Sequence, residues 1–150
     1  MDSQNELFAL CKKTGGTYMA YELRPYQKEC KDILDKTPTG NHLVVMATGL
    51  GKTVVMTHLK RKGRVLPLSH RDELVRQPEK YFDCSFGIEK AEEHAGDEEV
   101  VSASVQSLSR PDRMKRFAPD AFDTIIIDEA HHSAAKSYRA VLDYFSGAKR

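Results

Sequence analysis

The sequence predicts an α/β domain in which a mostly parallel sheet carries helices on both faces. Short apolar runs alternate with segments of helical periodicity along the chain, a pattern typical of strand–helix–strand units. The length of 150 residues matches one domain and is sufficient to bury a core. We expect residues 21–150 to form this domain and residues 1–20, which lack strong periodicity, to form an N-terminal extension.

Composition and charge indicate an ordinary globular chain. Apolar residues make up 40% and charged residues 30%, and the formal net charge is +1, which excludes a global basic field for nucleic acid. Residues 60–64 form a local basic run, although such runs are also typical of the solvated end of a helix. Three cysteines without CxxC spacing indicate free thiols in a reducing compartment. No apolar run reaches membrane-spanning length, and the N-terminus lacks a signal-peptide pattern, so we expect a cytoplasmic protein.

The first predicted elements surround a glycine-rich loop. Residues 25–36, PYQKECKDILDK, place apolar side chains at helical spacing after a proline in the first turn. Residues 41–47, NHLVVMA, form a short apolar run, as expected of a strand that is covered on both faces. Residues 52–62, KTVVMTHLKRK, predict a helix that Gly63 ends.

The middle of the chain is less regular. Residues 64–69, RVLPLS, predict a strand, but Pro67 lacks a backbone N–H and favours an edge strand or a bulge. Residues 71–77, RDELVRQ, predict a helix that Pro78 interrupts. Residues 85–99 combine a short apolar stretch with many acids, and we expect a short strand followed by a solvated loop.

The last third gives the clearest signals. Residues 99–105, EVVSASV, and 122–128, FDTIIID, predict strands. Residues 133–145, SAAKSYRAVLDYF, predict an amphipathic helix that presents Tyr138 and Val141, together with Leu142 and Phe145, on its apolar face.

The glycine-rich loop itself, GLGKT at residues 49–53, follows an apolar run and precedes a predicted helix. Glycines allow several backbone N–H groups to point at one anion, and a helix amino end adds its positive dipole. Lys52 can reach terminal phosphates, and the Thr53 hydroxyl suits magnesium. The alternative is an ordinary glycine turn. Met46 stands where the usual G-x-x-x-x-GK[ST] pattern has its first glycine.

A second cluster follows the isoleucine-rich strand in DTIIIDEAHH, residues 123–132. In phosphate-loop enzymes a second strand end must bring an acid to magnesium, because the ion needs oxygen ligands beyond the hydroxyl and the phosphates. Asp128 fits that role, and Glu129 is placed to orient and deprotonate the attacking water. We therefore predict Lys52, Asp128 and Glu129 as catalytic residues, and Thr53 and Asp128 as metal ligands.

With both clusters in place, the chain from about Leu23 onward resembles the first motor domain of a superfamily 2 helicase or translocase of the DEAH-box type. That domain is a RecA-like phosphate-loop NTPase. More narrowly, the chain resembles helicases related to nucleotide-excision-repair helicases and to restriction-enzyme motor subunits. LRPYQKEC resembles the family's adenine-recognition segment, MATGLGKT its motif I, where Met46 is normal, and IIIDEAHH its motif II. The resemblance implies ATP and Mg²⁺ as cofactors and places these residues at the nucleotide: Arg24, Tyr26, Gln27, Thr48, Gly49, Leu50, Gly51, Lys52, Thr53 and His131.

Two further segments resemble the motifs that touch nucleic acid. VLPLSHRDELVRQ resembles motif Ia and VVSASVQSLSR the next strand-edge motif. The resemblance implies contacts with the nucleic-acid backbone from Ser69, His70, Arg71, Ser104, Gln106 and Ser107. Plainer alternatives remain for single residues: Gln27 is also typical of a helix surface, and Arg71 can pair with the acids that follow it. The adjacent pair His131 and His132 lacks the further ligands of a metal site.

The resemblance also implies what a working motor needs in addition. ATP hydrolysis requires a second RecA-like domain, in cis or in trans, whose arginines stabilise charge on the γ-phosphate. DNA is expected as the track rather than RNA, and no membrane is involved. Family members continue beyond Arg150 into a Ser/Thr-Ala-Thr strand that lies between the phosphate-loop strand and the acid-bearing strand. Without it we expect a C-terminally incomplete domain whose sheet has a gap or a rearranged pairing.

Three functions compete. The favoured one is an ATP-hydrolysing DNA helicase or translocase domain, as a fragment or as one piece of a split motor. The second is a catalytically weak copy that binds nucleotide or DNA. The third is a small-molecule kinase, which is disfavoured because nothing resembles an acceptor-binding lid.

Overall fold

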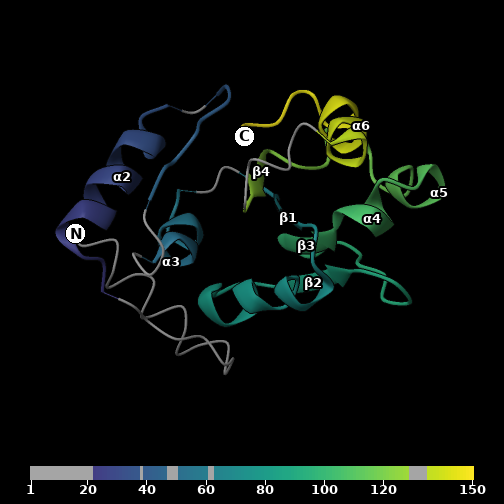
Figure 1. Ribbon diagram of the computed structural model, residues 1–150, viewed down its shortest axis with the longest axis horizontal. Coiled ribbons are helices and arrows are strands. Elements are labelled where there is room, and N and C mark those ends of the chain that lie inside the picture. Colours follow the sequence, from purple (N-terminus) through teal and green to yellow (C-terminus); the bar gives the residue numbers. More distant parts are fainter. Residues whose placement is uncertain (1–21, 38, 47–50, 61–62, 129–134) are drawn as a thin grey trace.

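The computed structural model describes residues 22–37, 39–46, 51–60, 63–128 and 135–150. These residues form a parallel four-stranded sheet in the order β2-β3-β1-β4 (Figure 1). The strands are β1 (Val65–Ser69), β2 (Phe86–Glu89), β3 (Val100–Ser104) and β4 (Thr124–Ile127). The prediction of a parallel α/β domain is confirmed. The predicted extension, residues 1–20, lies outside the described residues.

Over the described ranges, helices form at three predicted places and at two that were not predicted. The elements are α2 (Pro25–Asp35), α3 (Lys52–Thr57), α4 (Val105–Leu108), α5 (Pro111–Met114) and α6 (Lys136–Tyr144). α3 is shorter than predicted, since it ends at Thr57. The helix predicted at 71–77 is wrong, because two 3₁₀ turns, η1 (Asp72–Leu74) and η2 (Gln77–Tyr81), stand there instead. Pro78 lies in the first turn of η2, where a missing N–H costs least.

Both faces of the sheet are covered. On one face, Leu66 and Ile125 belong to a large apolar core that includes Tyr138 of α6, and Figure 1 shows α4, α5 and α6 gathered on that side. On the other face, Val65 packs in a smaller core with Phe82, which follows η2. Side chains of successive strand residues point to opposite faces, so one strand feeds both cores.

β1 is an interior strand, with β3 on one side and β4 on the other. This corrects the expectation that Pro67 confines the strand to an edge or a bulge. Pairing with β4 is continuous from Val65 to Leu68, whereas the residues paired with β3 are Val65, Leu68 and Ser69. The ladder with β3 therefore skips Leu66 and Pro67, and a missing N–H is tolerated where the ladder is interrupted.

The apolar segment 41–46 is not a strand, which corrects another prediction. Leu43 is 75% exposed and Val45 is 85% exposed, so these side chains are not buried on both faces of a sheet. Apolar composition marks a segment that can be buried, but a strand also needs a neighbour to pair with. A cavity of about 450 Å³ separates this segment from β4. Among the described residues, no strand fills the gap between this segment and β4.

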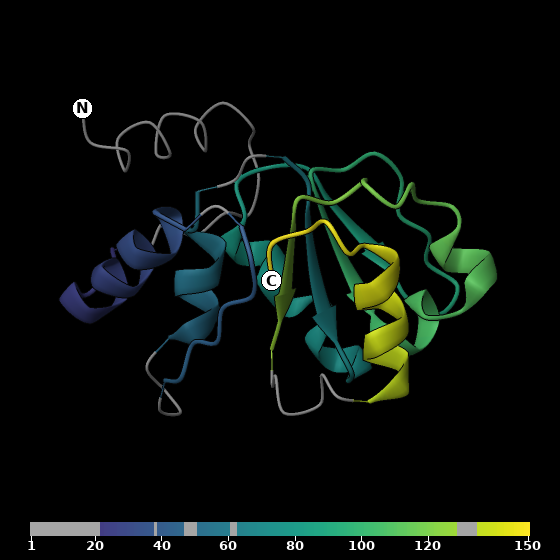
Figure 2. The same cartoon turned by 90° about the horizontal axis from the view of Figure 1, so that it is seen from above.

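The last two residues of the chain enter this gap. Lys149 forms a parallel bridge with Thr124 of β4, and its carbonyl accepts a hydrogen bond from the Ile125 N–H at 2.7 Å. On the other side, the Arg150 carbonyl accepts one from the His42 N–H at 2.7 Å. Figure 2 shows the C-terminus beside β4, with α2 and α3 together beyond it.

Candidate functional site

The candidate site lies at the carboxyl edge of the sheet. β1 ends at Ser69, which is the register partner of Ser104 at the end of β3. β4 ends at Ile127, the partner of Leu68, and Asp128 follows directly. Ligands of open parallel sheets bind outside the carboxyl ends of the strands, so the predicted acid and both predicted nucleic-acid motifs meet at the expected edge.

The phosphate loop approaches this edge through the start of α3. Gly51 precedes the helix with a φ of 76°, in the left-handed region that favours glycine. Lys52 and Thr53 form the first turn of α3 and are half-buried. The predicted residues Thr48, Gly49 and Leu50 lie outside the described residues.

Gln27 lies against the phosphate loop. It is buried on α2, with 6% of its surface exposed, so the alternative of an ordinary surface residue is wrong. Its side-chain amide fills the space where a Cβ at Gly51 would stand, and its Oε1 accepts a hydrogen bond from the Arg24 N–H at 2.9 Å. Arg24 and Tyr26 are exposed beside it. The predicted adenine segment and the predicted phosphate loop are thus in contact at Gln27 and Gly51.

The two clusters that carry the predicted chemistry share their cavities. Lys52 and Asp128 both line the cavity of about 450 Å³ between α3 and β4. Thr53 and Asp128 both line a second cavity of about 30 Å³, which Ser69 also borders. The amino end of α3 and the carboxyl end of β4 therefore face a common space. Glu129 and His131 lie outside the described residues.

The residues assigned to nucleic acid differ in accessibility. Arg71 is exposed and His70 half-buried, whereas Ser69 and Ser104 are buried. Among the described residues, no carboxylate forms an ion pair with Arg71. The alternative, in which Arg71 pairs with the acids that follow it, is therefore wrong. The Ser104 hydroxyl donates a hydrogen bond to Gln106 Oε1 at 2.8 Å. Of the two basic residues in this set, His70 and Arg71, Arg71 is the more exposed.

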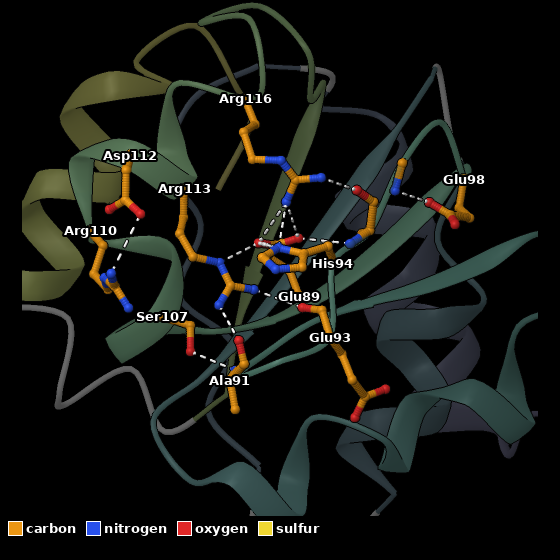
Figure 3. A network of polar contacts seen from close by, with 12 residues as sticks. Glu89, Ala91, Glu93, His94, Glu98, Ser107, Arg110, Asp112, Arg113 and Arg116 are labelled. Atoms are coloured by element: carbon orange, nitrogen blue, oxygen red, sulfur yellow. Dashed lines mark hydrogen bonds and ion pairs between the residues drawn. The ribbon is translucent and has the colours of Figure 1, made fainter.

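Sequence reasoning missed a buried polar network at the end of β2 (Figure 3). Glu89 is fully buried and accepts hydrogen bonds from Arg113 Nε and from the Ala95 N–H, both at 2.7 Å. Arg116 reaches the same carboxylate at 3.2 Å. Arg113 also donates to the carbonyls of Ala91 and Glu93.

A buried carboxylate is stable only with cations and N–H donors close to it. Because these donors come from the segment around α5 and from the loop after β2, the network holds the two segments together. The sequence feature that could have indicated this network is a glutamate at the end of an apolar strand. Nothing local in the sequence identifies its distant arginine partners.

The cysteines and the metal-ligating side chains of the described residues bear on alternative chemistry. Burial raises the pKa of the Cys30 thiol on α2, so it stays protonated near neutral pH. Cys30 and Cys84 are not joined by a disulfide, and Cys11 lies outside the described residues. Over the described ranges, histidines, cysteines and acids do not gather in threes as a metal site of side chains alone would need. Nor does any helix in those ranges have the length and apolarity to cross a bilayer.

Comparison with known proteins gives consistent relatives. A family model described as "Type III restriction enzyme, res subunit" matches residues 20–150. The putative ATP-dependent helicase IRC3 of Saccharomyces cerevisiae is 37% identical over 87% of the chain. The putative mitochondrial ATP-dependent helicase irc3 of Schizosaccharomyces pombe is 33% identical over 93% of it. A type I restriction enzyme EcoAI endonuclease subunit of Escherichia coli is 36% identical over 71%.

The chain spans only part of each relative: 22%, 27% and 15% of their respective lengths. Among solved structures, a hypothetical ATP-dependent RNA helicase from Sulfolobus tokodaii superposes with a TM-score of 0.69 at 17% identity. The superposition covers 99% of this chain and 49% of that one. It shows that the two chains share the parallel α/β fold.

Proposed function

The chain belongs to the family of type III restriction enzyme res subunits, and on this premise we propose that it is the ATP-binding domain of a DNA helicase or translocase. The observation that carries the proposal is the small cavity that Thr53 and Asp128 share at the carboxyl edge of the sheet, with Gln27 against Gly51 at the same loop. A bound nucleotide needs a cation, metal ligands and a base-recognition group, and Lys52, the pair Thr53 and Asp128, and Gln27 are residues of those three kinds.

The residues take the following roles in this proposal. Lys52 holds the terminal phosphates, while the Thr53 hydroxyl and the Asp128 carboxylate are oxygen ligands of the kind that magnesium prefers. Both residues line the same small cavity, which supports a shared ion as their ligand. Glu129 orients the attacking water and accepts its proton. Magnesium, when bound, neutralises charge that develops on the γ-phosphate.

Nucleotide binding tests the first part. Lys52→Ala should weaken binding of a fluorescent ATP analogue at least tenfold, because a charge-assisted contact to phosphate is lost. Lys60→Ala, at an exposed position after α3, is the matched control and should leave affinity unchanged. Equal affinity of Lys52→Ala and wild type would contradict the proposal.

Hydrolysis tests the second part. We propose that the chain alone turns over ATP slowly and that a second RecA-like domain supplies the arginines, whose absence lowers the rate by about 10³–10⁵. Radiolabelled ATP turnover should rise when the second domain and single-stranded DNA are added, and Lys52→Ala should abolish the rise. Fast DNA-stimulated hydrolysis by the isolated chain would contradict the proposal that a second domain is required.

DNA is the nucleic acid on which we propose that the motor moves. The restriction-enzyme relatives support it, and binding of oligodeoxyribonucleotides and oligoribonucleotides of equal length is the test. The alternative, a catalytically weak module that only binds nucleotide or DNA, would keep DNA affinity in Lys52→Ala and show no reconstituted turnover. A cytoplasmic location remains a prediction, while the Schizosaccharomyces relative is named as mitochondrial.

We also propose that the motor sheet takes a further strand in the cavity between β4 and segment 41–46. The pairings of Lys149 with β4 and of Arg150 with His42 support this, because together they start a parallel strand between the two. A chain extended beyond Arg150 by an alternating apolar segment should unfold at higher urea concentration than the 150-residue chain. Equal midpoints would count against this placement.

A further inference from the structure

The side chain of Gln106 joins the ends of two neighbouring strands. Ser104 of β3 donates a hydrogen bond to Gln106 Oε1 at 2.8 Å, and Gln106 Nε2 donates to the carbonyl of His70 at 2.5 Å. His70 follows Ser69, the register partner of Ser104. A carbonyl can only accept, so the amide nitrogen must face His70, and the oxygen that remains matches the serine hydroxyl.

The segment after β1 is held at two more carbonyls. Lys90, beside the end of β2, donates to the Asp72 carbonyl at 3.2 Å. The buried Ser102 hydroxyl of β3 donates to the Val75 carbonyl at 2.6 Å. Side chains from β3, from α4 and from the residue after β2 thus bind three carbonyls of residues 70–75, and these neighbours set the path of the segment.

Arg71 lies between the first two held carbonyls. Its side chain is exposed, and among the described residues no acid neutralises it. Its backbone, with φ −108° and ψ 128°, is extended. A guanidinium on a segment fixed in advance binds a phosphate at a lower ordering cost than one on a free loop.

We propose that Gln106 is a positioning residue that holds residues 70–72 so that Arg71 meets a backbone phosphate of nucleic acid. The inference rests on the proposed function, since it takes a nucleic-acid phosphate as the ligand of Arg71. It assigns Gln106 an indirect role in place of the direct contact that the family resemblance implies. Gln106 is exposed, and each end of its side-chain amide makes one hydrogen bond within the protein.

A double-mutant cycle tests the indirect role. In the 150-residue chain, Gln106→Leu should bind fluorescently labelled dT20 about three- to tenfold more weakly than wild type. Arg71→Ala should also weaken binding and reduce the dependence of log K on log salt by about one. The double variant should bind no more weakly than Arg71→Ala, because Gln106 acts through Arg71. Additive losses would mean that Gln106 contacts nucleic acid itself and would overturn the proposal.

Hydrogen exchange of the free chain provides the second readout. Gln106→Leu should exchange faster in residues 70–75 and at the wild-type rate elsewhere, and unchanged exchange there would overturn the proposal. Ser109→Ala, whose hydroxyl lies 3.4 Å from the Gln106 carbonyl, is the control and should change neither readout. Should Gln106→Leu not fold, Ser104→Ala removes the partner of the amide oxygen and is expected to act in the same direction.

The two proposals fail differently. A wild-type chain that binds no oligonucleotide overturns the nucleic-acid part of both. Oligonucleotide binding that is intact in wild type and equal in Gln106→Leu overturns the positioning role alone.

Discussion

The side-chain amide of Gln27 on α2 occupies the space where a Cβ at Gly51 would stand. Two segments that are separated by the apolar stretch 41–46 are therefore in van der Waals contact at the proposed nucleotide site. The contact explains why this loop position needs glycine twice over, for its positive φ and for the room that Gln27 takes.

Gly51→Ala should destabilise the chain by about 1–2 kcal/mol from backbone strain alone, and should also displace Gln27 and weaken ATP binding. Urea unfolding and titration with a fluorescent ATP analogue measure the two effects. Gly147→Ala is the control, because no atom lies within 4 Å of its added Cβ. Loss of stability with intact ATP binding would show that the contact does not serve the nucleotide.

Gln27→Ala should reduce affinity for ATP about fivefold to tenfold, the effect of one or two hydrogen bonds. Affinity for inorganic triphosphate should stay the same, since Gln27 is expected to bind the adenine edge only. Calorimetric titration of both ligands gives the comparison. A parallel loss for both ligands would indicate that Gln27 acts by supporting Gly51 rather than by recognising the base.

Arg113→Met should lower the free energy of unfolding by about 3–5 kcal/mol, because it leaves the Glu89 carboxylate buried without its closest cation. Arg110→Met is the matched control. Its partner Asp112 is 67% exposed, and such surface pairs contribute at most about 1 kcal/mol. Equal effects of the two substitutions in urea unfolding would contradict the burial of the Glu89 network.

Leu43→Ala should change the free energy of unfolding by less than about 0.5 kcal/mol, as expected at an exposed position. Leu66→Ala, in the large core, should lower it by about 2–5 kcal/mol. The same denaturation series measures both. A loss above 2 kcal/mol for Leu43→Ala would mean that segment 41–46 is a buried strand in solution.

Local sequence determined the elements whose period is strong and self-contained. The isoleucine run became β4, EVVSASV became β3, and the helical spacing after Pro25 and around Tyr138 became α2 and α6. These assignments succeed because side-chain periodicity and proline placement are properties of a short stretch of chain. For the motifs, residue type and spacing in GLGKT and DEAHH predict the chemistry, and that assignment stays a prediction.

Tertiary structure decided which strands pair, and so which predictions were wrong. Pro67 is tolerated in an interior strand because the ladder between β1 and β3 is interrupted at Pro67. Segment 41–46 stays exposed because no described strand pairs along it. Glu89 is buried beside arginines that are more than twenty residues away in sequence, and Gln106 reaches a carbonyl 36 residues away. Hydrogen-bond partners of this kind are brought together only when the chain folds, so no local pattern encodes them.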